Sequence, residues 1–196
     1  AVGVGSNATG NTTTALGIGT DAAGERSVAA GAFATTIGAF SAAYGFDSRA
    51  SGLFSIAIGS ESRANADRTT VIGANAVASA INSVAIGAGS VADVANTFAV
   101  GAVGNERRIV NVANGTVAAG NTDAVNGGQL FAVQSTANTA LTNAAAAQTT
   151  ADNALTAANA AQTTANSGVA AAASAQSTAN TALANAAAAQ GTANTA

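Results

Sequence analysis

Short apolar phrases that end in glycine return along the first half of the chain, as in Phe54–Gly59 (FSIAIG) and Asn82–Gly87 (NSVAIG). Glycine stands at every seventh residue from Gly3 to Gly59 and at every fourteenth from there to Gly101, and alanine usually precedes it by two residues. A seven-residue period also suits a coiled coil, but each glycine costs a helix about 1 kcal/mol. The pattern therefore predicts short strands joined by tight turns, in which glycine supplies positive φ.

The residue before each glycine place alternates in character, so the repeating unit is 14 residues with two unlike strands. One series is apolar: Val2, Leu16, Ala30, Tyr44, Ile58, Ile72, Ile86 and Val100. The other series is mostly polar, as at Ser51 and Asn65. Because side chains alternate between the two faces of a strand, the alanine column is predicted to fill a narrow roll while its neighbours point outward.

The two outer faces of such a roll differ, and each predicts a different use. An apolar face that recurs in every coil predicts association between copies of the chain, with a monomeric solenoid as the alternative. The predicted interface consists of Leu16, Tyr44, Ile56, Ile58, Ile72, Val84, Ile86, Phe98 and Val100. The polar face predicts ligand contacts at Arg49, Ser51, Arg63 and Asn65, with Asp47, Glu61 and Arg68 in turns nearby.

The tail from residue 132 repeats a different 14-residue phrase, first as QSTANTALTNAAAA from Gln134. Leucine or valine alternates with glutamine every seven residues, and alanine follows at the three–four spacing of a coiled coil. The predicted core positions are Leu141, Gln148, Leu155, Gln162, Val169, Gln176 and Leu183. A register with an all-alanine core is also open, and a disordered alanine-rich linker is the other alternative.

Residues 106–131 connect the two repeats. The β-branched start, ERRIV, suits a last strand, and Asn121, Thr122 or Asp123 is expected to cap the helix that DAVNGGQL begins. The predicted divisions are therefore a roll at 1–105, a connector at 106–131 and a helical rod at 132–196.

Composition narrows the functions that this chain can perform. It has no histidine or cysteine, and all six of its cations are arginine, so nucleophilic, metal-binding and Schiff-base sites lack their usual residues. The nine carboxylates are scattered singly, and the net charge of −3 without a basic cluster argues against nucleic acid and anionic membranes. We expect no enzyme activity, cofactor or metal. The absence of a signal peptide or transmembrane stretch suggests a piece of a longer protein.

Repeated SVAIG-like phrases, a connector ending in TDAVNGGQL and a long coiled coil together resemble the trimeric autotransporter adhesins of the YadA type. The resemblance implies a left-handed parallel β-roll head, a neck that hands each chain to its neighbour, and a trimeric coiled-coil stalk. It also implies a bacterial outer-membrane location, with a C-terminal anchor outside this chain. The expected function is adhesion, as a homotrimer, to host matrix proteins of the collagen, fibronectin or laminin class. The alternative is a structural spacer whose binding head lies elsewhere in a surface fibre.

Overall fold

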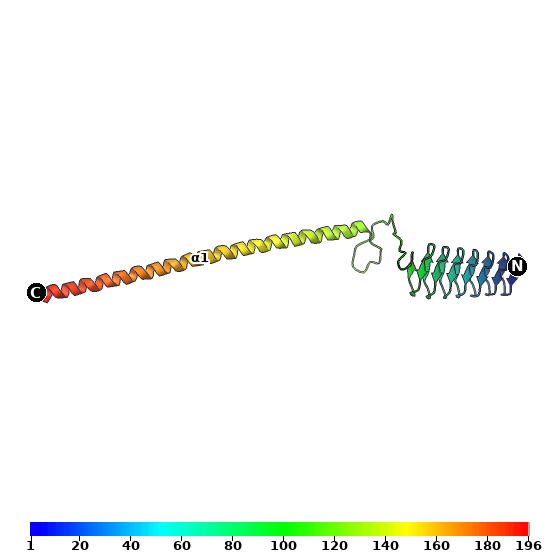
Figure 1. The fold of residues 1–196 in the computed structure, drawn as a ribbon, viewed down its shortest axis with the longest axis horizontal. Coiled ribbons are helices and arrows are strands. Elements are labelled where there is room, and N and C mark those ends of the chain that lie inside the picture. Colours follow the sequence, from blue (N-terminus) through cyan, green and yellow to red (C-terminus); the bar gives the residue numbers. More distant parts are fainter. Residues whose placement is uncertain (196) are drawn as a thin grey trace. The chain divides into compact units, whose positions relative to one another are not determined.

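The computed structural model describes residues 1–195, and the chain divides into two units. The first runs from Ala1 to Val110, and the second begins at Asn111. Each unit is built from one kind of secondary structure: the first from short strands and the second from a single long helix (Figure 1).

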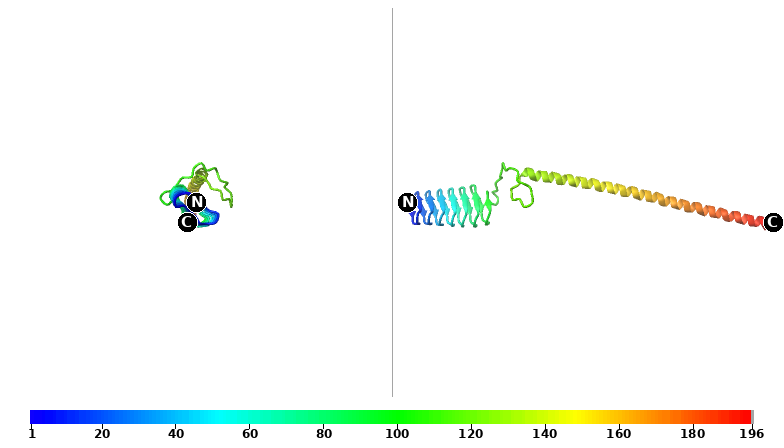
Figure 2. Two further views of the ribbon diagram at one scale, coloured as in Figure 1. Left: turned by 90° about the vertical axis from the view of Figure 1, so that its right-hand side faces the viewer. Right: turned by 180° about the vertical axis from the view of Figure 1, so that it is seen from behind.

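The first unit is a parallel β-solenoid, whose coils stack one upon another from blue to green in Figures 1 and 2. Its strands form two seven-stranded sheets. Sheet A contains β2 (Thr14–Leu16), β4 (Val28–Ala30), β6 (Ala42–Tyr44), β8 (Ile56–Ile58), β10 (Thr70–Ile72), β12 (Val84–Ile86) and β14 (Phe98–Ala99). Sheet B contains β1 (Asn7–Ala8), β3 (Asp21–Ala22), β5 (Thr35–Thr36), β7 (Arg49–Ala50), β9 (Arg63–Ala64), β11 (Val77–Ala78) and β13 (Val91–Ala92).

Strand pairing repeats every 14 residues without a slip. In sheet A, Val71 pairs with Ala85, and in sheet B, Arg49 pairs with Arg63. This register confirms the predicted 14-residue unit with two unlike strands. It also places equivalent residues of successive coils beside one another, about 4.8 Å apart, so that one sequence position becomes a row along the solenoid.

The interior of the roll is made of small side chains. The alanine column is buried as predicted, for example at Ala43, Ala57 and Ala85, which are fully inaccessible. Val71 is the largest of the buried apolar side chains. Since the two sheets are separated by methyl groups, they approach closely, and side chains larger than valine are placed outside the roll.

A second buried column, three residues after the glycine places, consists mostly of serine and threonine hydroxyls, with alanine at Ala34 and Ala76. Ser55 donates from Oγ to the carbonyl of Gly52 at 2.7 Å, and Ser41 does the same to Gly38 at 2.6 Å. Ser27 and Thr36 share a hydrogen bond of 2.7 Å across the interior. Most of these hydroxyls satisfy a turn carbonyl that the narrow core would otherwise bury without a partner.

The glycine repeat follows from close contact between coils. Gly45 has a φ of +131°, and an added Cβ there would lie 2.6 Å from the carbonyl oxygen of Gly59 in the next coil. The three glycine places filled by other residues are Ala66, Ala80 and Val94. All three follow strands of sheet B, where the equivalent glycines do not have positive φ, so a side chain meets no backbone strain there.

The second unit contains α1 (Gly127–Thr195), a helix of 69 residues. The predicted cap at residues 121–123 is wrong, because Asn126 caps the helix. Its Oδ1 accepts the N–H of Gln129 at 3.1 Å, and the Gln129 Oε1 accepts the N–H of Asn126 at 3.2 Å. This reciprocal pair is a capping box, which satisfies two N–H groups at once and fixes where the helix begins. Among the described residues, no helix combines the length and apolar character that crossing a membrane requires.

Candidate adhesive and assembly surfaces

The outer face of sheet A is an apolar surface that runs the length of the solenoid. The predicted interface residues lie on it in two parallel rows, because the strands are in register. Leu16, Tyr44, Ile56, Ile58, Ile72 and Phe98 are exposed in the single chain, and Val84, Ile86 and Val100 are half-buried. Leu16 keeps 51% of its surface exposed and Phe98 keeps 61%. A row of large aliphatic side chains this long is a surface that a soluble chain normally covers.

The outer face of sheet B brings the four predicted ligand-facing residues together. Arg49 pairs directly with Arg63 across β7 and β9. Ser51 and Asn65 follow those strands at equivalent places, so the four side chains occupy two neighbouring rungs. Arg49 and Asn65 are exposed, and Ser51 and Arg63 are half-buried.

Two neighbouring arginines repel each other, and the face contains groups that offset this repulsion. Arg63 forms an ion pair of 3.2 Å with Asp47, which lies in the turn before β7. Arg49 donates from Nε to the hydroxyl of Ser51 at 2.9 Å. Both guanidinium groups are thus held in place with part of their surface in solvent, and an exposed pair of this kind contributes little to stability.

The polar character of sheet B is confined to part of its length. Ile37, Val77 and Val91 occupy outward positions on the same sheet, and Ile37 and Val91 are exposed there. The arginine rungs therefore lie between apolar positions rather than within a uniformly polar sheet.

The turns of the solenoid have a feature that sequence analysis missed. The second residue after each glycine place from Gly3 to Val94 has positive φ, and most of these residues are not glycine. Asp47, Glu61 and Arg68 occupy such positions, at φ of 47°, 58° and 56°, so their predicted location in turns is confirmed. The seven-residue spacing of these positions is the signal that would have located them.

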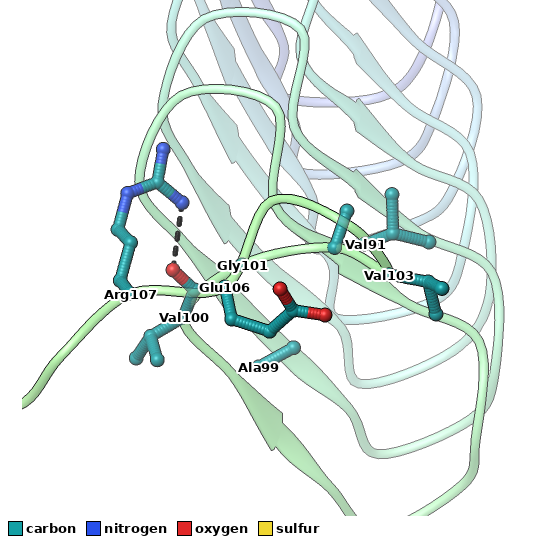
Figure 3. Close-up of a pocket in the computed structure, with 8 residues that line it drawn as sticks. Val91, Ala99, Val100, Gly101, Val103, Glu106 and Arg107 are labelled. Carbon is teal, nitrogen blue, oxygen red and sulfur yellow. Dashed lines mark hydrogen bonds between the residues drawn. The ribbon is translucent and has the colours of Figure 1, made fainter.

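The last coil ends in a structure that replaces a further strand. The strand expected over ERRIV is absent, because Arg107 folds back over the end of the roll. Its Nη1 donates to the carbonyl of Val100 at 2.6 Å (Figure 3) and to the hydroxyl of Ser90 at 3.0 Å. Its Nη2 donates to the carbonyl of Ala88. The guanidinium group thus occupies hydrogen-bonding positions that backbone N–H groups fill in earlier coils.

A hollow of about 360 Å³ lies beside this end of the roll. Val91 and Val103 line one side of it, and Glu106 and Arg107 lie opposite (Figure 3). The N–H of Gly104 donates to the Glu106 carboxylate at 2.9 Å, and this hydrogen bond lowers the pKa of Glu106. The hollow is lined mostly by apolar side chains, with one carboxylate and one guanidinium group. Such a lining is better suited to packing against another apolar surface than to catalysis.

The residues before α1 are held by the same side chains that cap it. Gln129 accepts the N–H of Gly115 at 3.0 Å and donates to the carbonyl of Gly115 at 2.6 Å. Asp123 accepts the N–H of Thr116 at 2.9 Å, and this bond lowers the pKa of its carboxyl group. The connector therefore forms a loop that Gln129 and Asp123 fasten near the first turn of the helix. Sequence analysis named Asp123 only as a candidate cap and did not single out Gln129. The spacing of Asn126 and Gln129 was the available signal.

The predicted core positions of the rod are exposed along the single helix. Leu141, Leu155, Val169 and Leu183 lie on its surface, and Leu141 keeps 71% of its area exposed. The core glutamines Gln148, Gln162 and Gln176 each donate from Nε2 to a side chain one turn later, at 2.8 to 2.9 Å. Apolar side chains at this spacing need partner helices to cover them.

Within residues 1–195, no group of three or more carboxylates, histidines or cysteines is placed to hold a metal ion. The arrangement as a whole offers two long surfaces, one apolar and one partly charged, and a helix with an uncovered apolar seam. These are features of assembly and surface contact.

Comparisons with known proteins match this chain in separate ranges. A family model described as the YadA head domain repeat matches residues 1–20, 50–76 and 78–102. A second, described as the coiled stalk of trimeric autotransporter adhesin, matches residues 108–153. Together the two cover more than half of the chain. No curated protein matches it.

One solved structure that is similar to this chain is the crystal structure of the collagen-binding domain of the Yersinia adhesin YadA. The two are 25% identical, and the match covers 67% of this chain and 89% of the other, with a TM-score of 0.45.

Proposed function

Because this chain belongs to the YadA-type trimeric autotransporter adhesins, we propose that its head binds an extended matrix protein across the outer face of sheet B. The chain is an adhesin with a solenoid head and the start of a coiled stalk. Its family consists of adhesins rather than enzymes, and they are exposed on the bacterial outer membrane. The proposal concerns which surface of the head is adhesive and what it contacts.

The observation that carries this proposal is the pair of arginine rungs. Arg49 and Arg63 stand in register on neighbouring strands, each with part of its guanidinium group exposed and oriented by a local partner. A charged group that is already oriented loses less conformational entropy when it binds. Ser51 and Asn65 add hydrogen-bonding groups beside them.

The outer face of sheet A is proposed to serve assembly instead. Its rows of isoleucine, valine and leucine are too apolar to remain in water, and a trimer covers them by packing three copies around one axis. In the stalk, the proposed core consists of the leucines, the valine and the core glutamines described above. The predicted divisions at 1–105, 106–131 and 132–196 remain the proposed boundaries of head, neck and stalk.

The proposed partner class is a fibrous matrix protein of the collagen, fibronectin or laminin type. A fibrous ligand that crosses neighbouring coils meets a repeated row of groups, and a trimeric head presents that row three times. Several weak contacts then combine into one stronger interaction, because the second and third contacts form at high effective concentration.

The test compares the wild-type chain with Arg49→Ser/Arg63→Ser and with the control Arg108→Ser. We expect saturable binding of the wild type to immobilised matrix proteins, a large loss in the double variant and no change in the control. Thermal unfolding of the same samples should be nearly unchanged, since both arginines lie at the surface.

Two outcomes would contradict the proposal. If the double variant binds as well as the wild type, the adhesive surface lies elsewhere, with the turn loops and the free end of the head as the next candidates. If the wild type binds none of the matrix proteins, the segment acts as a spacer within a longer surface fibre.

A further inference from the structure

Three phenylalanines occupy backbone positions that normally disfavour them. Phe33, Phe40 and Phe54 have φ of 60°, 56° and 57°, in the left-handed region where asparagine and glycine are the usual residues. Later coils use Asn75 and Asn82 at equivalent turn positions. An aromatic side chain kept in this conformation at the surface points to a use that offsets the strain.

The aromatic residues form two patches on opposite edges of the roll. The first edge holds the turns that lead from sheet A to sheet B, and its patch consists of Phe33 and Phe46, whose rings meet edge to face at 5.9 Å. A Cβ on Gly19 would lie 2.8 Å from the Phe33 ring, so glycine at that place leaves the ring its space. Both rings are about half exposed.

The second edge holds the turns that lead from sheet B to sheet A. Its patch consists of Phe40 and Phe54, which stack at 5.0 Å with an angle of 22° between the rings, together with Leu53. The guanidinium group of Arg26 lies over the Phe40 ring, 5.4 Å from its centre. The Phe40 and Phe54 rings are also about half exposed.

The two patches lie at the same level along the solenoid. Phe33 and Phe40 belong to the coil at 31–44, and Phe46 and Phe54 belong to the coil at 45–58. A cyclic trimer joins unlike surfaces of neighbouring copies, and a threefold axis parallel to the solenoid keeps each coil level with the same coil of the next copy. Matching patches at one level on two different edges are what such a contact requires.

We propose that the first-edge patch of one copy packs against the second-edge patch of the next copy, so that aromatic contacts close the trimeric head at coils 31–58. The edges flank the apolar outer face of sheet A, and the proposed contact continues that surface around the sides of the roll. The proposal concerns how the heads join and does not depend on which surface binds a ligand.

The next coils support the same pairing through their charges and amides. In the coil at 59–72, Glu61 lies on the first edge and Arg68 on the second, and both are exposed. Within the described residues, neither has an ion-pair partner in its own chain. One coil further, Asn75 lies on the first edge and Asn82 on the second. Along the four coils from 31 to 86, the proposed contact therefore pairs aromatic with aromatic, acid with base and amide with amide.

Engineered disulfides test the contact directly, because the chain has no cysteine of its own. Phe46→Cys and Leu53→Cys are combined in one chain, since each residue belongs to one of the two patches and neither position has positive φ. After oxidation, we expect disulfide-linked dimers and trimers on a non-reducing gel. Each single variant should remain a monomer on the same gel, because the contact joins unlike edges.

Two stability measurements complete the test. Asparagine fits the left-handed conformation, so Phe40→Asn/Phe54→Asn should relieve strain and raise the melting temperature if these rings contact nothing. We expect the melting temperature of the trimer to fall instead, while the control Thr12→Asn, at the same turn position outside the patch, leaves it unchanged or raises it. Absence of disulfide-linked chains together with a rise in the melting temperature of the Phe→Asn variant would overturn the proposal.

A charge exchange examines the neighbouring level independently. Glu61→Arg and Arg68→Glu should each lower the melting temperature of the trimer, and the double variant should recover most of the loss. If the loss in the double variant equals the sum of the two single losses, the two edges do not meet at this coil.

Discussion

The cap at the end of the solenoid can be tested with a single substitution at Arg107. Arg107→Ala removes a guanidinium group that donates to the carbonyls of Val100 and Ala88 and to the hydroxyl of Ser90. In earlier coils, the carbonyl equivalent to that of Ala88 accepts a backbone N–H from the next coil, as Ala74 does from Gly89. Alanine at 107 therefore leaves the last coil with carbonyl groups that face only water.

The expected magnitude follows from these bonds. A hydrogen bond to a charged group contributes about 1.5–3 kcal/mol when it is shielded. The carbonyls at this end are partly exposed, and water replaces part of the loss, so we expect the free energy of unfolding to fall by about 1–3 kcal/mol per chain. Because solenoid coils depend on their nearest neighbours, the loss should appear first as fraying of the last coil.

The assay combines thermal unfolding, followed by circular dichroism, with hydrogen exchange of the amides in 84–101. Arg107→Ala should melt earlier and exchange faster in that segment only. The melting temperature of Arg107→Lys should lie between those of the wild type and Arg107→Ala. An ammonium group cannot bridge two carbonyls in the way that the planar guanidinium group does. Arg108→Ala is the matched control, because this neighbour has no hydrogen-bond or ion-pair partner within the described residues. If Arg107→Ala behaves as Arg108→Ala does, the guanidinium group does not cap the roll.

Three further predictions address the turns, the stalk and the neck. Gly45→Ala should lower the stability of the head by more than about 1 kcal/mol, since the φ of +131° at this residue disfavours a side chain. Gly168→Ala in α1 should instead raise helix stability by about 1 kcal/mol. Calorimetry of both variants should show these opposite changes. Replacing the core glutamines by isoleucine should raise the melting temperature of the stalk, and a fall would show that the all-alanine register is correct. The pKa of Asp123 is lower in the folded chain, so its carboxylate contributes stability that is complete above the ordinary pKa of about 3.9. This stability is lost as the pH falls through the lower folded pKa. The amide signal of Thr116 should report the loss, and Asp123→Asn should abolish this pH dependence.

Much of the head could be predicted because its residues act through repetition. The alanine column has a fixed spacing and a fixed face, and strand geometry then places it inside the roll. The hydroxyl column has the same seven-residue spacing, three residues after most of the glycine places, and was equally available from the sequence. It was missed because serine is usually assigned to the surface, whereas in a narrow roll a short hydroxyl is the group that satisfies a buried turn carbonyl.

The ends of the repeats were harder to predict, because a residue that occurs only once there does not belong to a repeating pattern. Arg107 lies in a sequence that favours a strand, and only the unpaired carbonyls of the last coil explain why it folds back. Asn126 was likewise passed over for three candidates that stand a few residues earlier in the connector. The capping box selects Asn126 because Gln129 follows at the spacing that allows two reciprocal hydrogen bonds.

The size of the core side chains ties the folding of the head to its assembly. Except for Val71, the buried apolar side chains are alanines, each of which buries roughly one methyl group, worth about 0.8 kcal/mol. Fixing the backbone of one residue costs about 1–2 kcal/mol, so these methyl groups contribute less than the ordering of the chain requires. The larger side chains of the same coils, such as Tyr44 and Ile58, lie on the outer face of sheet A and become buried only when copies associate. The head and the trimer should therefore form together, and the melting temperature of the wild-type chain should fall as the chain is diluted. A head that melts at the same temperature across a wide dilution series would show that a single roll is stable alone.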